Sequence, residues 1–223
     1  MKKIICKEVS KTFTHLNSGK KVEVFSDVNI KILQNESVAI LGSNGAGKTT
    51  LLRIICGALH PTTGSINVHG RTSWPVGFGG GFDPYLTARD NIKFISNMMG
   101  YGFEQSQEIQ SQIEKEAGLE GRLDYMVSSY SSGMKSRLFF YTSIMFDFDF
   151  YLFDEISAVG DRNFQGSSNS ILKELSRDHG IVVVTHAVKR VSRYCDYGYV
   201  LDCGKISEKL PIDEAIAIYE NIQ

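Results

Sequence analysis

The hydrophobic pattern of the chain first predicts strands. Some short runs are almost entirely apolar and rich in β-branched or aromatic residues, which is typical of strands buried on both faces of a parallel sheet. These runs are Ser37–Leu41, Phe150–Phe153 and Ile181–Val184. More mixed patterns predict strands at residues 1–9, 22–33 and 65–69, with a polar connection from His15 to Lys21, and a hairpin over Tyr199–Ile206 with Gly204 in its turn.

Helical spacing of apolar positions is concentrated between residues 86 and 147. We expect helices at residues 91–99 and 105–117, another beginning near Ser132, and a terminal helix at residues 211–222. The layout predicts a single domain of the α/β class. Residues 1–85 and 148–223 form its core, which includes an N-terminal antiparallel β region, and residues 86–147 are an inserted helical subdomain.

The segment Gly42–Thr49 fits the phosphate-binding P-loop pattern G-x-x-x-x-G-K-[ST]. It follows the buried run Ser37–Leu41 and precedes a helical pattern, which is the context that this loop requires. Glycines allow backbone N–H groups to surround phosphate oxygens, and the positive end of the following helix faces the same anion. The phosphate-binding residues expected here are Gly42, Ser43, Asn44, Gly45, Ala46, Gly47, Lys48, Thr49 and Thr50.

Two side chains of this loop carry specific chemistry. Lys48 can reach the terminal phosphates, and the Thr49 hydroxyl can bind Mg²⁺. The alternative interpretation is a glycine-rich turn that binds nothing, and the strand–loop–helix context favours the phosphate site.

The run Phe150–Phe153 ends in adjacent carboxylates, Asp154 and Glu155. A P-loop enzyme uses the first acid to hold Mg²⁺ beside the loop, and the second can orient and deprotonate an attacking water. Two acids at a solvated strand end are common, so the upstream P-loop is what favours the catalytic interpretation.

Two further positions are candidate phosphate contacts. The helix that begins near Ser132 presents Ser131 and Gly133 at its N-terminus, which is either an anion site or an ordinary serine N-cap. His186 follows the run Ile181–Val184, and an imidazole at a strand end of such a sheet can hydrogen-bond a terminal phosphate. A lone histidine is more often structural.

Composition excludes several classes of protein. Lys plus Arg minus Asp plus Glu is 24 − 25 = −1, so no basic excess favours nucleic-acid binding. No apolar run approaches the roughly 18 residues of a membrane span, and the N-terminus lacks a secretory signal. A membrane role would therefore be peripheral. Without C-x-x-C spacing, we expect Cys6, Cys56, Cys195 and Cys203 to be reduced and mostly buried.

These motifs, in this order, resemble the ATP-binding cassette (ABC) ATPases over essentially the whole chain. Gly42–Thr49 corresponds to Walker A, Phe150–Asp154 to Walker B, and Ala158–Asp161 to the D-loop. The family signature LSGGQ corresponds to Tyr130–Met134, in which Ser132 replaces a glycine and Met134 a glutamine. The resemblance implies that Glu155 is the catalytic base, that His186 is the switch histidine, and that Phe13 stacks on adenine.

One branch of the family shares these departures. The matching segments are Ser73–Val76, Gly79–Phe82, Leu86–Thr87, Tyr130–Met134 with Arg137, and Ala158–Asp161. They resemble the ATPase subunits of capsular polysaccharide exporters and, more distantly, of O-antigen and teichoic-acid exporters. O-antigen exporters often carry a carbohydrate-binding extension. The chain stops at Gln223, so we expect the capsule type.

The resemblance implies an Mg²⁺-dependent ATPase that powers polysaccharide export through an integral membrane permease, at the cytoplasmic face of the inner membrane. It also implies a head-to-tail homodimer in the ATP-bound state, in which each site adds the partner's Ser131 and Gly133. Asp83 stands where most members place the Q-loop glutamine, so we expect it to meet the metal. Partner subunits would make most contacts with the polysaccharide. The loop Trp74–Tyr85, with the helix after it, either docks on the permease or packs in the core.

The sequence leaves other functions open. A soluble ABC ATPase acting on DNA or the ribosome usually has a long coiled-coil insertion or two cassettes, and neither pattern is present. A P-loop small-molecule kinase would not need the signature-type helix start or His186. A regulatory subunit without hydrolysis is motivated by Asp83 and Ser132. The ATPase motifs alone also allow import, and only the branch resemblance favours export.

Overall fold

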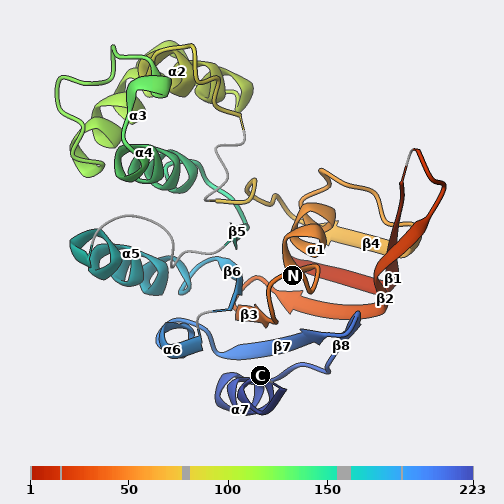
Figure 1. The fold of residues 1–223 in the computed structure, drawn as a ribbon. Helices are drawn as coiled ribbons and strands as arrows, with labels where there is room; N and C mark the ends of the chain where they lie inside the picture. The colour runs from red at the N-terminus through yellow and green to blue at the C-terminus, as the bar shows by residue number, and fades with distance from the viewer. Residues whose placement is uncertain (1, 16, 77–80, 155–161, 187, 223) are drawn as a thin grey trace. The chain divides into compact units, whose positions relative to one another are not determined.

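The computed structural model describes residues 2–15, 17–76, 81–154, 162–186 and 188–222. The chain divides into two compact units. The first unit is formed by residues 1–75, 148–157 and 168–223, and the second by residues 76–147 and 158–167. The element order mixes strands and helices in the α/β arrangement expected from the sequence (Figure 1).

The first unit contains a mainly parallel sheet with the strand order β5-β6-β3-β7-β8. Its strands are β3 (Ser37–Leu41), β5 (Phe150–Asp154), β6 (Gly180–Thr185), β7 (Tyr197–Asp202) and β8 (Lys205–Ile206), and β9 (Leu210–Pro211) pairs with β7. Every residue of β3, β5 and β6 is buried, which confirms the prediction made from their apolar runs. The predicted hairpin is also present, because Leu201 pairs antiparallel with Ile206.

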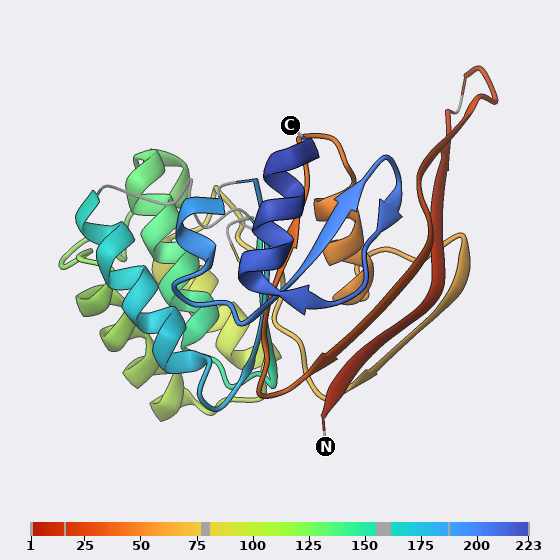
Figure 2. The ribbon, with the colours of Figure 1, turned by 90° about the horizontal axis from the view of Figure 1, so that it is seen from below.

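An antiparallel sheet with the order β2-β1-β4 belongs to the same unit. It consists of β1 (Lys3–Thr14), β2 (Lys21–Leu33) and β4 (Thr63–His69). Strand β1 continues beyond the expected end at residue 9, because its last residues pair with the start of β2. Figure 2 shows β1 and β2 as two long strands that run side by side. The extension places Phe13 in a paired strand, opposite Val22.

Helices complete the first unit. Helix α1 (Lys48–Ile55) follows the P-loop, and α6 (Val188–Val191) and α7 (Ile212–Ile222) follow β6 and β9. Helix α5 (Arg162–Leu175) begins in the second unit and ends in the first. One apolar core joins the two sheets through α1, with Phe25 of β2, Leu52 of α1 and Phe150 of β5 among its fully buried members. The core therefore holds the P-loop helix between both sheets.

The second unit is helical between residues 86 and 147, as the spacing of apolar positions predicts. It contains α2 (Ala88–Met98), α3 (Phe103–Glu116), the 3₁₀ turn η1 (Val127–Ser129) and α4 (Ser132–Ile144). Helix α2 begins three residues before the predicted start at 91, because the Thr87 hydroxyl accepts a bond from the Asp90 N–H at 3.0 Å. Arg89 of α2 donates to both carboxylate oxygens of Asp124, in the segment between α3 and η1, at 2.6 and 3.1 Å.

The cysteines are free thiols, as expected, but their burial differs. Cys6 and Cys195 are buried, and burial raises the pKa of the Cys6 thiol to about 12. Cys203 is exposed, so the expectation of mostly buried thiols fails at this residue, which lies in the turn between β7 and β8. In the described part of the chain, no helix has the length and apolarity required to cross a membrane.

Asp149 connects chain segments that are distant in sequence. Its Oδ1 accepts from the Lys2 ammonium at 2.5 Å, and its Oδ2 accepts from the Arg71 backbone N–H at 2.7 Å. Burial alone would raise the pKa of the Asp149 carboxyl, but these hydrogen bonds outweigh it and lower the pKa below 3.8. The folded state therefore prefers the charged carboxylate at the point where the N-terminus meets the start of β5.

We predict that Asp149→Asn lowers the free energy of unfolding by about 1–3 kcal/mol at pH 7, because the Lys2 ammonium and the Arg71 backbone N–H lose a charged acceptor. A group whose pKa is lowered by folding stabilises the protein above its unfolded pKa, and this contribution disappears as pH falls through the folded pKa. Urea unfolding of both proteins from pH 7 downward tests this. The difference should shrink in acid, and a difference that is absent at pH 7 or grows in acid would contradict the prediction.

Candidate functional site

The site begins where parallel strands end at one edge of the sheet. Leu41 at the end of β3 pairs with Thr185 of β6, and Asp154 at the end of β5 pairs with Val184 of β6. The P-loop follows β3, so this register brings Walker A and Asp154 to the same edge. Ligands of open α/β sheets bind at the carboxyl ends of the strands.

Close packing shapes the P-loop. A Cβ on Gly42 would lie 2.4 Å from the Leu201 carbonyl oxygen of β7, and one on Gly47 would lie 2.5 Å from a methyl carbon of Val24 on β2. Gly47 also has φ +100°, a left-handed conformation that side chains rarely adopt. Gly47 is the N-cap residue of α1. Because glycine has no side chain, no side-chain cap accepts a hydrogen bond from the first N–H groups of the helix. Uncapped N–H groups at a helix start are an anion site.

Lys48 folds back over the loop. Its ammonium donates to the Gly42 carbonyl at 2.7 Å and to the Ser43 carbonyl at 2.8 Å. The residue is only 8% exposed. These bonds hold the positive charge at the mouth of the P-loop, where a phosphate group would complete its coordination.

Thr49 and Asp154 supply oxygen atoms next to the loop. The Thr49 hydroxyl donates to Asp154 Oδ1 at 3.1 Å, and Asp154 is only 9% exposed. A hydroxyl and a carboxylate are hard oxygen ligands of the kind that Mg²⁺ accepts. Among the described residues, no group of three or more His, Cys, Asp or Glu side chains could hold a metal alone. The two residues fit a magnesium ion whose remaining ligands would be phosphate oxygens and water.

Phe13 lies beside a hollow near the tip of the β1–β2 hairpin. The hollow has a volume of about 460 Å³ and is lined by Phe13, Thr14, His15, Asn17 and Val22. Val22, opposite Phe13, is two residues from Val24, which contacts the P-loop at Gly47. Two strand residues span about 7 Å. An aromatic ring and a hollow are therefore available near the phosphate site.

His186 is exposed directly after β6, at the edge of the sheet that carries Asp154. Glu155, the D-loop segment 158–161 and the loop glycines Gly79 and Gly80 lie outside the described residues.

The second unit carries the remaining predicted contacts. The Ser131 hydroxyl accepts from the Met134 N–H at 3.3 Å and so acts as the N-cap of α4. Among the described residues, no atom would lie within 4 Å of a Cβ on Gly133, so the helix start has open space. The Asp83 carboxylate accepts from the Tyr85 N–H at 2.8 Å.

Asn91 is a residue that the sequence did not single out. Its amide is 1% exposed, accepts from the Asp83 N–H at 2.7 Å and donates to the Asp83 carbonyl at 2.9 Å. It thereby holds the backbone of Asp83. Lys11, whose ammonium lies 5.0 Å from the centre of the Phe13 ring, was also missed. Its position two residues before Phe13 is the one signal in the sequence, because alternate residues of a strand share a face.

The aromatic loop contains both packed and exposed side chains. Trp74 packs edge-on against Phe148, with ring centres 5.5 Å apart, and Phe82 packs against Phe139 at 4.7 Å. Tyr85 is 77% exposed. Leu86, Tyr125 and Met126 are also exposed, and a bond from Val127 N–H to the Leu86 carbonyl holds their two segments together. We call these four side chains, Tyr85, Leu86, Tyr125 and Met126, the apolar patch.

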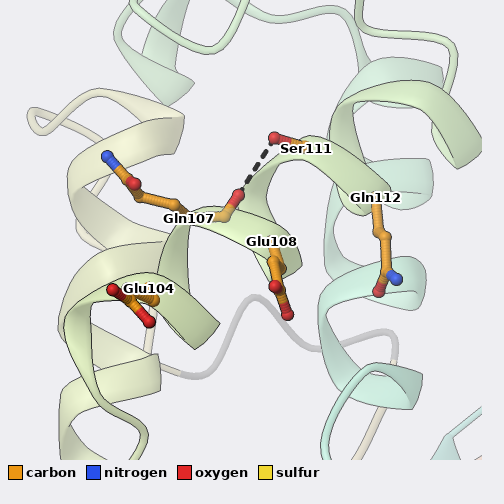
Figure 3. A pocket seen from close by; sticks show the side chains of 5 residues that line it. All are labelled: Glu104, Gln107, Glu108, Ser111 and Gln112. Carbon is orange, nitrogen blue, oxygen red and sulfur yellow. Dashed lines mark hydrogen bonds between the residues drawn. The ribbon is translucent and has the colours of Figure 1, made fainter.

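A second hollow of about 510 Å³ lies on α3 (Figure 3). Its lining side chains are all polar: Glu104, Gln107, Glu108, Ser111 and Gln112. The bond drawn in Figure 3 runs from the Ser111 hydroxyl to the Gln107 carbonyl. The hollow contains none of the predicted site residues, and its two carboxylates oppose phosphate binding.

Comparisons with known proteins identify the relatives of this chain. The ABC transporter family matches residues 25–158. The polysialic acid transport ATP-binding protein KpsT of Escherichia coli is 39% identical over 90% of this chain and 85% of its own length. The ATP-binding protein BexA of Haemophilus influenzae is 37% identical over 94% of both chains. The capsule polysaccharide export ATP-binding protein CtrD of Neisseria meningitidis serogroup B is 37% identical over 89% of this chain and 91% of its own.

The fold also has a close counterpart among solved structures. The ATP-binding cassette MJ0796, solved as a dimer bound to ADP and Pi, superposes with a TM-score of 0.82. The match covers 94% of this chain and 98% of MJ0796 at 21% identity, so it concerns the fold. The family match covers more than half of the chain, and the sequence relatives are similar along almost all of it. The chain belongs to the ABC transporter family.

Proposed function

We propose that this chain is the ATP-hydrolysing subunit of an exporter that moves a capsular-type polysaccharide across the inner membrane through a partner permease. The observation that carries the proposal is the phosphate site itself. Lys48 lies over the P-loop carbonyls, and Thr49 meets Asp154 at 3.1 Å. The export direction and the polysaccharide cargo are supported by relatives whose names describe polysialic acid transport and capsule polysaccharide export.

The residues of the first unit have distinct roles in this proposal. The P-loop N–H groups and Lys48 bind the β- and γ-phosphates, and Phe13 stacks on the adenine ring. Glu155 orients and deprotonates the attacking water, and His186 hydrogen-bonds the γ-phosphate. Magnesium, held by Thr49 and Asp154, would neutralise charge on the β- and γ-phosphate oxygens.

The second unit contributes through a second copy of the chain. In a head-to-tail homodimer, the partner's helix start with Ser131 and Gly133 closes over ATP. ATP binding then favours the closed dimer and hydrolysis the open one, which is a ligand-driven shift of populations. Asp83 takes the place of the Q-loop glutamine and would meet the metal. The proposed division has a core of residues 1–85 and 148–223, which includes Asp83, and a helical subdomain of residues 86–147, which includes Ser131 and Gly133.

We further propose that the apolar patch docks on the permease, which holds the chain peripherally at the cytoplasmic face of the inner membrane. Tyr85 at 77% exposure and Met126 at 55% leave large apolar surfaces in water. Surfaces of this kind mark interaction sites. The polysaccharide is contacted mainly by the partner subunits, and nucleic acid has no part in this function.

Lys48→Ala should weaken ATP binding about 10- to 100-fold, because the phosphate charge loses its main cationic hydrogen-bond donor. Isothermal titration calorimetry with MgATP measures this. Arg53→Ala is the matched control, since it removes an exposed cation from the last turn of the same helix. Equal affinity of Lys48→Ala and wild type would refute the P-loop assignment.

Glu155→Gln should slow hydrolysis about 10²- to 10⁴-fold, because the water loses its general base, while ATP binding remains. The stalled variant should also accumulate as a dimer with ATP. Phosphate release and light scattering measure the two effects. A variant that hydrolyses ATP at the wild-type rate would show that Glu155 is not the base.

The transport assignment is tested by purifying the chain from native membranes under mild detergent and identifying the bound proteins by mass spectrometry. We expect a polytopic permease. Replacing Tyr85 and Met126 by Ser should reduce its recovery, while replacing the exposed Glu104 and Glu108 on α3 should not. Recovery of ribosomes, DNA or soluble partners alone would contradict export and leave the ATPase chemistry in place.

A further inference from the structure

Lys11 and Phe13 form a contact that the roles above do not use. The Lys11 ammonium lies over the Phe13 ring, 5.0 Å from its centre, which is a cation–π geometry. The same ammonium donates to the His60 carbonyl at 2.8 Å. The backbone of Lys11 is therefore held in β1, and its ammonium is held by the His60 carbonyl in the segment before β4.

The Phe13 ring contacts a cation and also lines a hollow. One face carries the Lys11 ammonium. The hollow of about 460 Å³ is lined by Phe13 together with Thr14, His15, Asn17 and Val22, and Lys11 is not among these residues. A planar ligand in this hollow would therefore meet the Phe13 ring without meeting Lys11.

Phe13 requires such support because it is 45% exposed. An exposed aromatic side chain on a hairpin loses rotamer freedom when a ligand stacks on it, and this loss weakens binding. A cation that already holds the ring reduces that loss. Phe13 pairs with Val22 on β2, the strand whose Val24 contacts the P-loop at Gly47.

We propose that Lys11 is a positioning residue for the nucleotide base: it holds Phe13 from behind so that the base stacks on the opposite face. This inference rests on the proposed function, in which Phe13 contacts adenine. Lys11 touches the base only through Phe13. It therefore contributes to the binding of the base and not to the binding of the phosphates.

The test compares ATP with inorganic tripolyphosphate, which has the phosphates but no base. Isothermal titration calorimetry with Mg²⁺ is run on wild type, Lys11→Met and Lys11→Gln. The glutamine amide can still donate to a carbonyl but carries no charge, so it separates the cation–π contact from the His60 bond. ATP binding should weaken about threefold to tenfold in both variants, with tripolyphosphate binding unchanged. Lys11→Arg should restore ATP binding, because guanidinium groups also pair with aromatic rings.

Lys21→Met is the matched control, since Lys21 is an exposed cation opposite Thr14 on the same hairpin. Phe13→Leu, alone and with Lys11→Met, completes a double-mutant cycle. Once Phe13 is replaced, Lys11→Met should have no further effect on ATP affinity. Equal losses for ATP and tripolyphosphate would mean a general charge effect and would overturn the inference.

Failure of the inference differs from failure of the proposed function. If Phe13→Leu weakens ATP binding but Lys11→Met and Lys11→Gln do not, Lys11 has no positioning role and the function stands. If Phe13→Leu leaves ATP affinity unchanged, the base does not stack on Phe13, and both the base contact and the inference fail. If wild type binds neither ATP nor tripolyphosphate, the proposed function itself fails.

Discussion

The space around the P-loop is the constraint on which the rest of the structure depends. The Leu201 carbonyl of β7 occupies the position that a side chain on Gly42 would need, and Val24 of β2 occupies that of Gly47. The loop is thus held between the parallel sheet and the antiparallel sheet. Any residue larger than glycine would separate the loop from one of them.

This packing has a chemical consequence. The loop is short and tightly held, so its carbonyls converge on the Lys48 ammonium, and the first turn of α1 faces the same space. The register of β5, β6 and β3 adds Asp154 beside Thr49. Contact between Gly47 and β2 also fixes how far the hollow at Phe13 lies from the phosphate site. The antiparallel sheet therefore sets the distance between the P-loop and the Phe13 ring.

Much of this arrangement could be predicted from the sequence, because short-range patterns determine it. Apolar runs identified β3, β5 and β6, and fixed spacing identified the P-loop of Gly42–Thr49. Spatial neighbours far apart in the chain were not predictable in this way. The sequence does not reveal that β1 continues to Thr14, since that end is stabilised by pairing with β2.

The contacts of single polar side chains could not be predicted from the sequence either. Asn91 is one polar residue in an amphipathic helix, and its two bonds to the Asp83 backbone depend on how the loop before α2 folds back. Cys203 is exposed because it lies in the turn between β7 and β8, although most of β7 is buried. The roles proposed for Ser131, Gly133 and Asp83 involve a second chain and a nucleotide, and they come from the resemblance to ABC ATPases.

The central claim is that one nucleotide binds along the line from Asp154 through the P-loop to Phe13. The most direct measurement is a crystal structure of the chain with Mg²⁺ and a non-hydrolysable ATP analogue. The account predicts phosphates against the N–H groups of Gly45–Thr49, the metal between Thr49 and Asp154, and the base on Phe13. A nucleotide bound elsewhere, or phosphates that do not contact Lys48, would contradict it.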